Sequence, residues 1–229
     1  MPLALFDLDR TVLAVNSARL WVDFEMKGGY LTRWQAVRAA AWIGTYHIGF
    51  TRLESLLEEA IATLAGSREE EVRARTEAFY AERIAHTYRP GAFEALKLHR
   101  EAGDTVALLT SSSNYLCAPV LRDLSLEHAL CNRFEVAEGV FTGKPAGPIC
   151  YAAGKVAHAI AFAERHGHTL AEATFYTDSM SDLPMLEAVG RPVAVNPDPR
   201  LRRLAKKRGW PVVDWGVSSP ADSGTSPAP

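Results

Sequence analysis

The sequence has few cysteines among its 229 residues and no excess of charge of either sign. Cys117, Cys131 and Cys150 are odd in number and widely spaced, which fits neither a disulfide framework nor a zinc-binding pattern and favours reduced thiols. The formal net charge is −2 and the isoelectric point is near 6.4, so no polyanion-binding surface is indicated. We therefore expect no nucleic-acid partner.

Long apolar runs are also missing. Asp7 and Asp9 interrupt the apolar residues of the N-terminal segment, which has no basic region, so no signal peptide is predicted. The most apolar later stretch, residues 39–50, includes Thr45 and His47 and is too short to span a bilayer. These features predict a cytoplasmic protein that does not contact a membrane.

Strand-like segments are absent from about residue 17 to residue 89. Apolar residues recur there at helical spacing, and Gly28-Gly29 and Gly66-Ser67 interrupt the pattern. Thr51 stands three residues before Glu54, which is the spacing of a capping box. The pattern predicts helices around residues 20–28, 34–41, 53–61 and 72–84. We assign residues 15–89 to an inserted, all-helical cap domain.

Beyond Pro90, short apolar runs alternate with helical segments. Strands are expected at residues 105–109, 133–136, 174–176, 192–195 and 212–213, helices at 93–101, 116–124, 155–164, 183–189 and 200–207, and a small hairpin at 139–143. With a first strand at Leu3–Phe6, this alternation predicts an α/β fold whose Rossmann-like, doubly wound parallel sheet core comprises residues 1–14 and 90–216. Residues 217–229, rich in Ser, Pro and Gly, are expected to form a flexible tail.

Polar side chains follow several of the predicted strands. Asp7 and Asp9 follow the first strand and share one side of an extended chain, where two like charges require a cation or a shared proton. Thr110 and Ser111 end the second strand, and Asp178 ends a later one. Because the carboxyl ends of parallel strands meet at one edge of a sheet, these groups should converge in one crevice. Carboxylate oxygens suit magnesium, although from the first stretch alone an ordinary acidic turn is an equal alternative.

Four segments in this order resemble the motifs of the haloacid dehalogenase-like superfamily. They are Phe6-Asp7-Leu8-Asp9-Arg10-Thr11, Leu109-Thr110, Lys155, and Tyr176-Thr177-Asp178-Ser179-Met180-Ser181-Asp182. The helical insertion resembles the C1 cap of that superfamily, and the chain is most similar to subfamily IB, the branch that contains phosphoserine phosphatase. The similarity runs from residue 3 to about residue 215, and its first and fourth motifs are the specific ones.

The resemblance implies a role for each acid. Asp7 would be the nucleophile that forms an aspartyl-phosphate, and Asp9 the general acid and then the general base. Mg²⁺ would be bound by the carboxylates of Asp7 and Asp178 and by the backbone carbonyl of Asp9. Asp182 would orient waters of the metal, with Ser179 beside it.

The resemblance also implies which groups bind the phosphoryl group. Thr110 and the backbone N–H of Ser111 would donate hydrogen bonds to its oxygens, and Lys155 would neutralise its charge and restrain the nucleophile. Arg10 and Ser112 are further candidates for substrate contact. The resemblance therefore predicts an Mg²⁺-dependent phosphatase of a small phosphomonoester.

Simpler structural roles remain open for some of these residues. Thr110 could merely end a strand, and Asp182 could cap the helix that begins at Leu183. Lys144, in a predicted turn, competes with Lys155, but the position of Lys155 matches the family motif. Three histidines are expected on or beyond an exposed helix and not at a metal: His158, His166 and His168.

The natural substrate is left open because the chain departs from its phosphoserine-specific relatives. Those relatives have a glutamate for the substrate ammonium shortly after the first motif, whereas residues 14–19 include no acid. Ser111-Ser112 replaces a glycine pair, Thr177 a glycine and Ser181 an asparagine. Aromatic side chains that face the crevice would suit a substrate with a ring, so histidinol phosphate is a second candidate, although such residues can equally form core. The candidates in the predicted cap are Trp21, Trp34, Trp42, Tyr46, His47 and Arg52.

Two other functions are compatible with an aspartate that accepts phosphate. A phosphotransferase would pass the phosphoryl group to another alcohol in place of water. A receiver-like switch would keep the phosphate for signalling, but such domains pair adjacent acids and lack a helical insertion of about seventy residues, so the Asp7-x-Asp9 spacing argues against this alternative.

Overall fold

The computed structural model describes residues 2–30 and 53–217. Its centre is a six-stranded parallel sheet with the strand order β3-β2-β1-β6-β7-β8. The strands are β1 (Leu3–Phe6), β2 (Thr105–Ser113), β3 (His128–Asn132), β6 (Thr174–Thr177), β7 (Arg191–Val195) and β8 (Val212–Val213). The order reverses at β1, and in doubly wound sheets this switch point is where a crevice opens outside the carboxyl ends of the strands.

Strand β1 is buried on both faces because helices cover both sides of the sheet. Ala4 and Phe6 face one core cluster, and Leu3 and Leu5 face the other, as the two-residue period of a strand requires. The first cluster includes residues of α5 (Pro90–Glu101) and α6 (Asn114–Leu124), and the second includes residues of α7 (Ala153–Arg165), α8 (Leu183–Ala188) and α9 (Pro199–Arg208). The predicted α/β fold is therefore confirmed.

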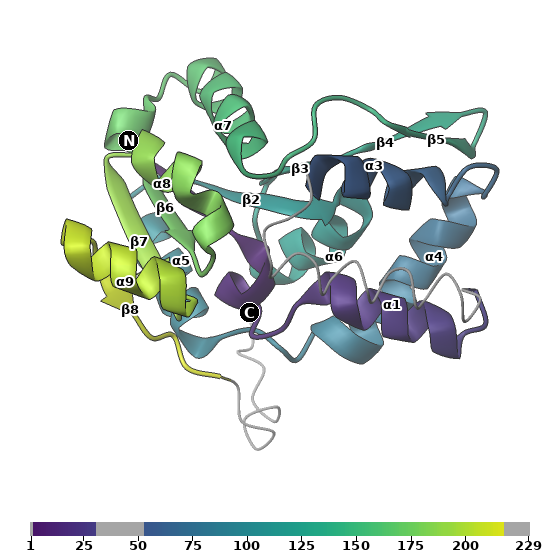
Figure 1. Ribbon diagram of the computed structural model, residues 1–229, viewed down its shortest axis with the longest axis horizontal. Coiled ribbons are helices and arrows are strands. Elements are labelled where there is room, and N and C mark those ends of the chain that lie inside the picture. The colour runs from purple at the N-terminus through teal and green to yellow at the C-terminus, as the bar shows by residue number, and fades with distance from the viewer. Residues whose placement is uncertain (1, 31–52, 218–229) are drawn as a thin grey trace.

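The secondary-structure elements that the structure describes between β1 and α5 are helical, and turns and short irregular stretches connect them. It contains α1 (Ser17–Lys27), α3 (Leu53–Ala62) and α4 (Glu69–Phe79), which continues into a π-helical turn, Tyr80–Ile84. Figure 1 shows α1, α3 and α4 together at one end of the molecule, away from β7 and β8. Trp21 of α1 packs against Phe79, with ring centroids 5.1 Å apart, so this tryptophan belongs to the core.

A small hairpin lies against these helices. It consists of β4 (Phe134–Ala137) and β5 (Val140–Pro145). The N–H of Gly66 donates to the carbonyl of Phe141 (3.0 Å), and the N–H of Glu69 donates to the carbonyl of Gly139 (2.9 Å). Backbone hydrogen bonds thus join the hairpin to the segments that follow α3 and begin α4.

The structure corrects the predicted strands in two places. Strand β3 was not predicted, and the strand expected at residues 133–136 is β4, which lies in the hairpin and not in the central sheet. The His128–Asn132 segment has no β-branched residue, so its strand character depends on pairing with β2. Strand β2 also continues past residue 109 to Ser113.

Other expectations remain as predictions. The helix expected at residues 34–41, Thr51 and all but one residue of the expected tail lie outside the described residues. The domain boundaries at residues 14 and 89 remain predictions. No helix of the described chain is both long and apolar enough to cross a membrane.

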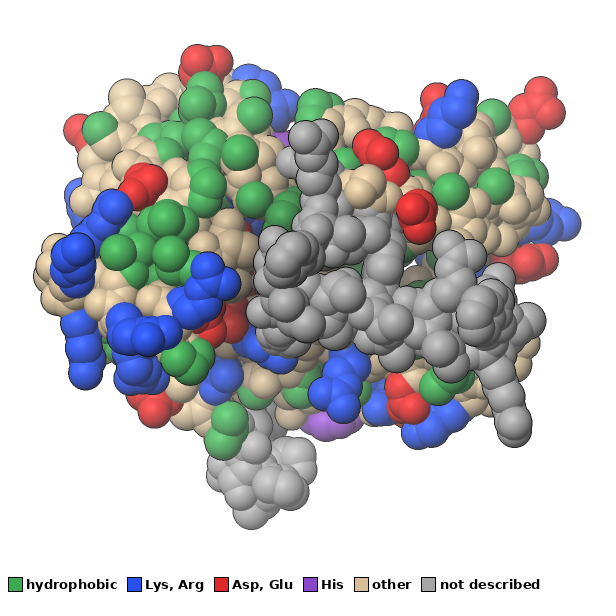
Figure 2. Space-filling view, in the orientation of Figure 1, with side chains coloured by type: hydrophobic (Ala, Val, Ile, Leu, Met, Phe, Trp, Pro, Cys, Tyr) green, Lys and Arg blue, Asp and Glu red, His purple; other side chains and the backbone are tan. Residues whose placement is uncertain are grey.

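The surface is less uniform than the small net charge suggests. Lys and Arg side chains gather over the end of the molecule where α9 lies (Figure 2). This helix reads Pro-Arg-Leu-Arg-Arg-Leu-Ala-Lys-Lys-Arg, and beyond Pro199 its exposed positions are all basic, while Leu201 and Ala205 are buried. The basic surface is therefore local.

Candidate active site

The first acid of the site lies where β1 ends. The Asp7 N–H donates to the carbonyl of Tyr176 on β6 (2.9 Å), and the Leu13 N–H closes the following turn on the carbonyl of Leu8 (2.9 Å). Within this turn Arg10 has a φ of 59°, a left-handed conformation that costs energy for a residue with a side chain. The chain thus leaves the central strand through a tight turn with Asp7 at its start.

A buried lysine joins two of the acids. Lys155 Nζ lies 2.7 Å from Asp7 Oδ1 and 2.8 Å from Asp182 Oδ2, and only 2% of Lys155 is exposed. Gly154 lets α7 begin this deep in the core, because a Cβ there would lie 2.1 Å from the Ile149 carbonyl oxygen. The three residues come from β1, α7 and the turn after β6, and they meet as one ion-paired group.

Thr11 bridges the first and fourth motifs. Its hydroxyl donates to Asp7 Oδ2 (3.4 Å) and accepts from the backbone N–H of Asp178 (3.0 Å). Thr11 is fully buried, and the sequence analysis assigned it no role although it lies in the first motif. This hydroxyl links the turn after β1 to the end of β6.

Asp9 is bound by the start of α1. Its Oδ1 accepts from the backbone N–H of Ser17 (2.6 Å), and its Oδ2 accepts from the Ser17 hydroxyl (3.0 Å) and from the Ser112 hydroxyl (3.4 Å). Ser17 is the first residue of α1, where free N–H groups favour an anion. Sequence reasoning did not find Ser17; the signal was a serine at the expected start of the helix.

The polar end of β2 forms the wall next to Asp9. The hydroxyl of Thr110 accepts from the N–H of Ser112 (3.1 Å), and the carbonyl of Ser111 accepts from the Asn132 side chain (2.7 Å). Asn132 also accepts from the Cys150 N–H (2.8 Å). Asn132, at the end of the unpredicted strand β3, therefore supports the end of β2, which carries the predicted phosphate-binding residues.

The fourth motif is ordered by its own hydroxyl groups. Thr177 donates to Asp182 Oδ2 (2.7 Å) and accepts from the Ser179 N–H (3.2 Å). The side chain of Asp182 makes no capping hydrogen bond at the start of α8, so the simple capping role is wrong. Thr177, which stands where the relatives have glycine, instead helps to orient this acid.

Burial and mutual repulsion raise the pKa values of the acids. Burial raises the pKa of Asp7 to about 7, against the opposing effect of Lys155, and the charge of Asp182 adds to the rise. Burial and the charge of Asp7 raise the pKa of Asp178 to about 8, partly offset by Arg10. Burial also raises the pKa of Asp9, although hydrogen bonds from Ser17 limit the rise.

Lys155 stays protonated in this environment. Burial by itself lowers its pKa, but the charges of Asp182 and Asp7 outweigh burial, and the net pKa is raised. Lys155 therefore faces several carboxylates, and the raised pKa values of Asp7 and Asp178 reflect a shortage of positive charge around them.

These residues fit a hard divalent cation. The donors are carboxylate oxygens, which Mg²⁺ prefers, and their raised pKa values reflect the cost of burying carboxylate charge with too few cations nearby. No three acidic, histidine or cysteine side chains in the described ranges are grouped closely enough to form a metal site by themselves. A cation here would therefore also need backbone or water oxygens.

Two further predicted residues, Arg10 and Ser179, lie in the turns that follow Asp9 and Asp178. Arg10 contributes its carbonyl to the Arg89 side chain (3.1 Å), and its own charge reaches Asp178. Ser179 lies in the turn after Asp178, where its hydroxyl contacts the Ser181 hydroxyl (2.9 Å).

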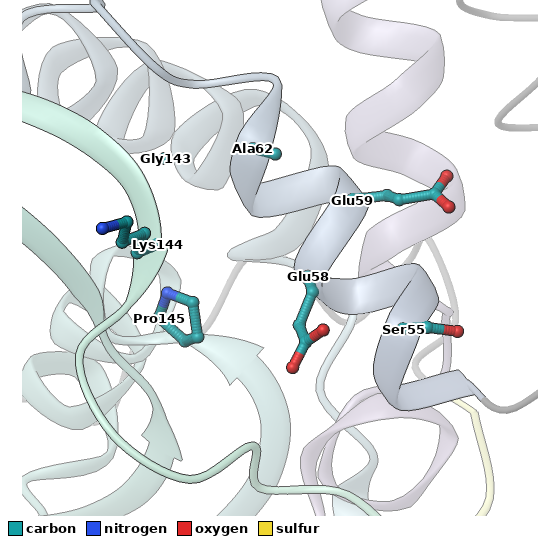
Figure 3. Close-up of a pocket in the computed structure, with 7 residues that line it drawn as sticks. All are labelled: Ser55, Glu58, Glu59, Ala62, Gly143, Lys144 and Pro145. Carbon is teal, nitrogen blue, oxygen red and sulfur yellow. The ribbon is translucent and has the colours of Figure 1, made fainter.

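Lys144 lies elsewhere. It lines a hollow of about 450 Å³ between α3 and β5 that holds none of the predicted site residues (Figure 3). Ser55 and Glu58 of α3 line the same hollow, and Glu58 points into the space between the helix and the hairpin (Figure 3). Of the two lysines considered, Lys155 is the one beside Asp7.

Known proteins resemble this chain in sequence and structure. The phosphoserine phosphatase SerB1 of Mycobacterium tuberculosis is 40% identical over 164 residues, which cover 71% of this chain and 53% of the relative. A histidinol-phosphatase of Neisseria meningitidis is 29% identical over 218 residues, covering 93% of this chain and 98% of the relative. A protein of unknown function from Bordetella pertussis superposes with a TM-score of 0.86 at 34% identity, covering 94% of this chain and 99% of that one.

The chain spans about half the length of the curated relatives that it matches at 38–40% identity. A sequence profile described as haloacid dehalogenase-like hydrolase matches residues 4–187, which include Asp7, Lys155 and Asp182. The match covers most of the central sheet and the whole of the hydrogen-bonded group. The chain therefore belongs to the haloacid dehalogenase-like hydrolase family.

Proposed function

We propose that the protein is an Mg²⁺-dependent phosphatase of a small phosphomonoester and that it acts through an aspartyl-phosphate on Asp7. The observation that carries this proposal is that the two acids have different partners. Asp7 is ion-paired with a buried lysine, whereas Asp9 is hydrogen-bonded to hydroxyls and an N–H group. A nucleophile and a separate proton carrier are what hydrolysis in two steps requires.

In the first step a carboxylate oxygen of Asp7 attacks phosphorus, and the bond from phosphorus to the ester oxygen breaks. Asp9 gives its proton to the departing alkoxide, and the raised pKa of Asp9 favours the protonated form that this step needs. In the second step Asp9 takes a proton from water, the water oxygen attacks phosphorus, and Asp7 is released with inorganic phosphate.

The surrounding groups hold the phosphoryl group and the nucleophile. Lys155 fixes Asp7 and adds positive charge beside the phosphoryl oxygens, while Thr110 and the N–H of Ser111 supply hydrogen-bond donors. In this proposal Arg10 and Ser112 contact the rest of the substrate, and the position of the Ser112 hydroxyl, 3.4 Å from Asp9 Oδ2, supports this role.

Asp7, Asp178 and the backbone carbonyl of Asp9 would hold Mg²⁺, with Asp182 and Ser179 beside them. When bound, the cation would offset the negative charge shared by the carboxylates and the phosphoryl group. The oxygen-only donor set and the raised pKa of Asp178 support this assignment.

The substrate is a small phosphorylated metabolite in this proposal. The named relatives include a phosphoserine phosphatase and a histidinol-phosphatase, and the second matches nearly its whole length. Residues 14–19 offer no acid for the ammonium of phosphoserine, and Asn16 uses its side chain to cap α1. We therefore rank histidinol phosphate above phosphoserine, and a cytoplasmic location is retained from the sequence.

The proposal is tested by phosphate release from an aryl phosphate with and without Mg²⁺. Asp7→Asn should lower kcat by about 1000-fold or more, because the nucleophile is lost. Asp23→Asn is the matched control, since Asp23 lies on the surface of α1 and pairs with Arg83. Full activity of Asp7→Asn, or equal activity with Mg²⁺ and with chelator, would contradict the proposal.

The same assay separates the candidate substrates and the transfer reaction. Release of phosphate from phosphoserine but not from histidinol phosphate would overturn the ranking. Phosphate appearing on an added acceptor alcohol, in place of inorganic phosphate, would identify a phosphotransferase.

A further inference from the structure

A second hollow lies between the edge strand β3 and helix α7. Its volume is about 420 Å³, and we call it the β3–α7 hollow. None of the proposed catalytic or metal-binding residues lines it. Its lining residues are Glu127, His128, Ala129, Leu130, Cys131, Arg133, Ala146, Gly147, Pro148, His158, Ala161, Phe162, Arg165 and His166.

Groups that are or can become positively charged dominate this lining. Arg133 and Arg165 carry permanent charge, and no carboxylate of the described chain lies within ion-pair distance of either. The lining contains a single acid, Glu127, and its Oε2 is 3.9 Å from His128 Nε2. The hollow therefore has a positive charge excess although the whole chain has a net charge of −2.

The histidines are arranged as a wall of the hollow. The ring of His128 lies 5.1 Å from that of His166 and 5.1 Å from that of Phe162, and the rings of Phe162 and His166 are 4.0 Å apart. Two of these histidines were singled out by the sequence, but the third, His128, comes from the unpredicted strand. Tertiary structure is what brings the three together.

Hydrogen bonds fix one proton on each of two histidine rings. His158 Nε2 donates to the Pro148 carbonyl (2.9 Å), and His166 Nδ1 donates to the Phe162 carbonyl (2.9 Å). The second nitrogen of each ring accepts when neutral and donates when protonated. An anion in the hollow would thus meet ring nitrogens of both histidines together with the charged donors of Arg133 and Arg165.

A cation does not fit this arrangement. Two arginines line the hollow, one nitrogen of His158 and one of His166 are already used as donors, and no group of three metal-ligating side chains exists among the described residues. An anion of charge −2 or more matches both the charge and the donors.

We propose that the β3–α7 hollow is a binding site for a small multivalent anion with carboxylate or phosphate groups. An occupant would touch α7, one helical turn beyond Lys155, and β3, one residue before Asn132. Both residues contact the catalytic group, Lys155 directly and Asn132 through the carbonyl of Ser111. The site would therefore lie against two supports of the active site.

The test is an NMR titration of the metal-free protein with citrate, followed by the imidazole resonances of all histidines. We expect saturable shifts of His128, His158 and His166 at millimolar citrate or below. His86, which is exposed in the segment between β1 and α5, should show no comparable shift. A parallel titration with sodium chloride at equal ionic strength measures the shifts that charge screening alone would cause. Inorganic phosphate as a second probe distinguishes a carboxylate site from a phosphate site.

The variant Arg133→Gln/Arg165→Gln should weaken citrate binding at least tenfold and leave the activity toward the aryl phosphate unchanged without citrate. Arg203→Gln on the exposed side of α9 is the matched control and should bind citrate as the wild type does. Equal shifts at His86 and in the hollow, or unchanged affinity in the double variant, would overturn the proposal. Because binding is read without turnover, its failure is independent of failure of the proposed phosphatase activity.

Discussion

At the scale of single residues, the site depends on how charge is balanced among buried side chains. Among the residues that the structure describes, Lys155 is the one cation in direct contact with Asp7 and Asp182, and all three are almost fully buried. A buried charge whose partner is removed is costly, because neither water nor another ion replaces the lost interaction.

Lys155→Met should therefore lower the free energy of unfolding by about 3–5 kcal/mol and abolish aryl phosphatase activity. The reason is that Asp7 and Asp182 would face one another without a cation between them. Urea unfolding at pH 7.5 without metal measures the first effect. Lys144→Met, at an exposed position of β5, should change stability by less than about 0.5 kcal/mol. Equal stability of the two variants would contradict the buried ion group.

The hydroxyl of Ser17 is expected to tune Asp9. Its hydrogen bond lowers the pKa of Asp9 against the effect of burial, so Ser17→Ala should raise that pKa further and move the pH–rate profile to higher pH. The backbone N–H of residue 17 is kept in this variant, and we expect kcat at pH 7 to change by about tenfold or less.

The measurement is kcat against pH for the aryl phosphate. Ser67→Ala, in the turn after α3, removes a hydroxyl away from Asp9 and should leave the profile unchanged. A profile of Ser17→Ala that coincides with that of the wild type would remove Ser17 from the site.

At the scale of elements, the hairpin and the helices of the insertion behave as one packed unit. Phe141 of β5 is 2% exposed and packs with Val72 of α4 and Tyr115 of α6. The backbone of Phe141 also bonds to both sides of the turn after α3, through Gly66 and Ser67. Packing and hydrogen bonds thus reinforce each other at this junction.

Phe141→Ala should lower the free energy of unfolding by about 3–5 kcal/mol, because a fully buried aromatic ring is removed. The amides of Gly66 and residue 141 should exchange faster with deuterium, since their hydrogen bonds join the hairpin to the turn after α3. Phe93→Ala is the control, since Phe93 is 49% exposed. Unchanged exchange at Gly66 in Phe141→Ala would show that the hairpin does not stabilise this junction.

At the scale of the whole molecule, the acids of the site oppose folding at neutral pH when no cation is bound. The folded pKa values of Asp7, about 7, and Asp178, about 8, lie above the ordinary value of 3.8. Between about pH 4 and pH 8 the folded protein keeps protons that the unfolded chain releases, so these groups make stability fall as pH rises. A bound cation would favour the ionised acids and reverse this effect.

We therefore expect the metal-free protein to be less stable at pH 8 than at pH 5.5, and Mg²⁺ to stabilise it more at pH 8. Asp178→Asn should be more stable than the wild type at pH 8 without metal and should gain little from Mg²⁺. Urea midpoints at both pH values, with Mg²⁺ or chelator, provide the comparison. Greater stabilisation by Mg²⁺ at pH 5.5 would contradict the assigned ionisation.

Much of the fold followed from local patterns. The helices α6, α7 and α9 and the strands β1, β6 and β7 were predicted within a few residues, because each has a clear apolar period and turn residues at its ends. Strand β3 was not predicted, because its sequence has no strand propensity and its pairing partner, β2, is the cause of its conformation. Because β3 was not predicted, the contact of Asn132 with Ser111 at the end of β2 was not predicted either.

The sequence by itself identified candidate residues: the spacing of Asp7 and Asp9 and the acids of the fourth motif can be read from it, and the resemblance to the family motif selected Lys155 over Lys144. Only the tertiary structure decided how they pair. In the folded chain Lys155 pairs with both Asp7 and Asp182, and Asp9 accepts hydrogen bonds from Ser17. The hydroxyls of Thr11 and Thr177 bridge neighbouring groups. The physical reason is that hydrogen bonds and ion pairs depend on distances of about 3 Å, which folding sets between residues up to 167 positions apart in the chain.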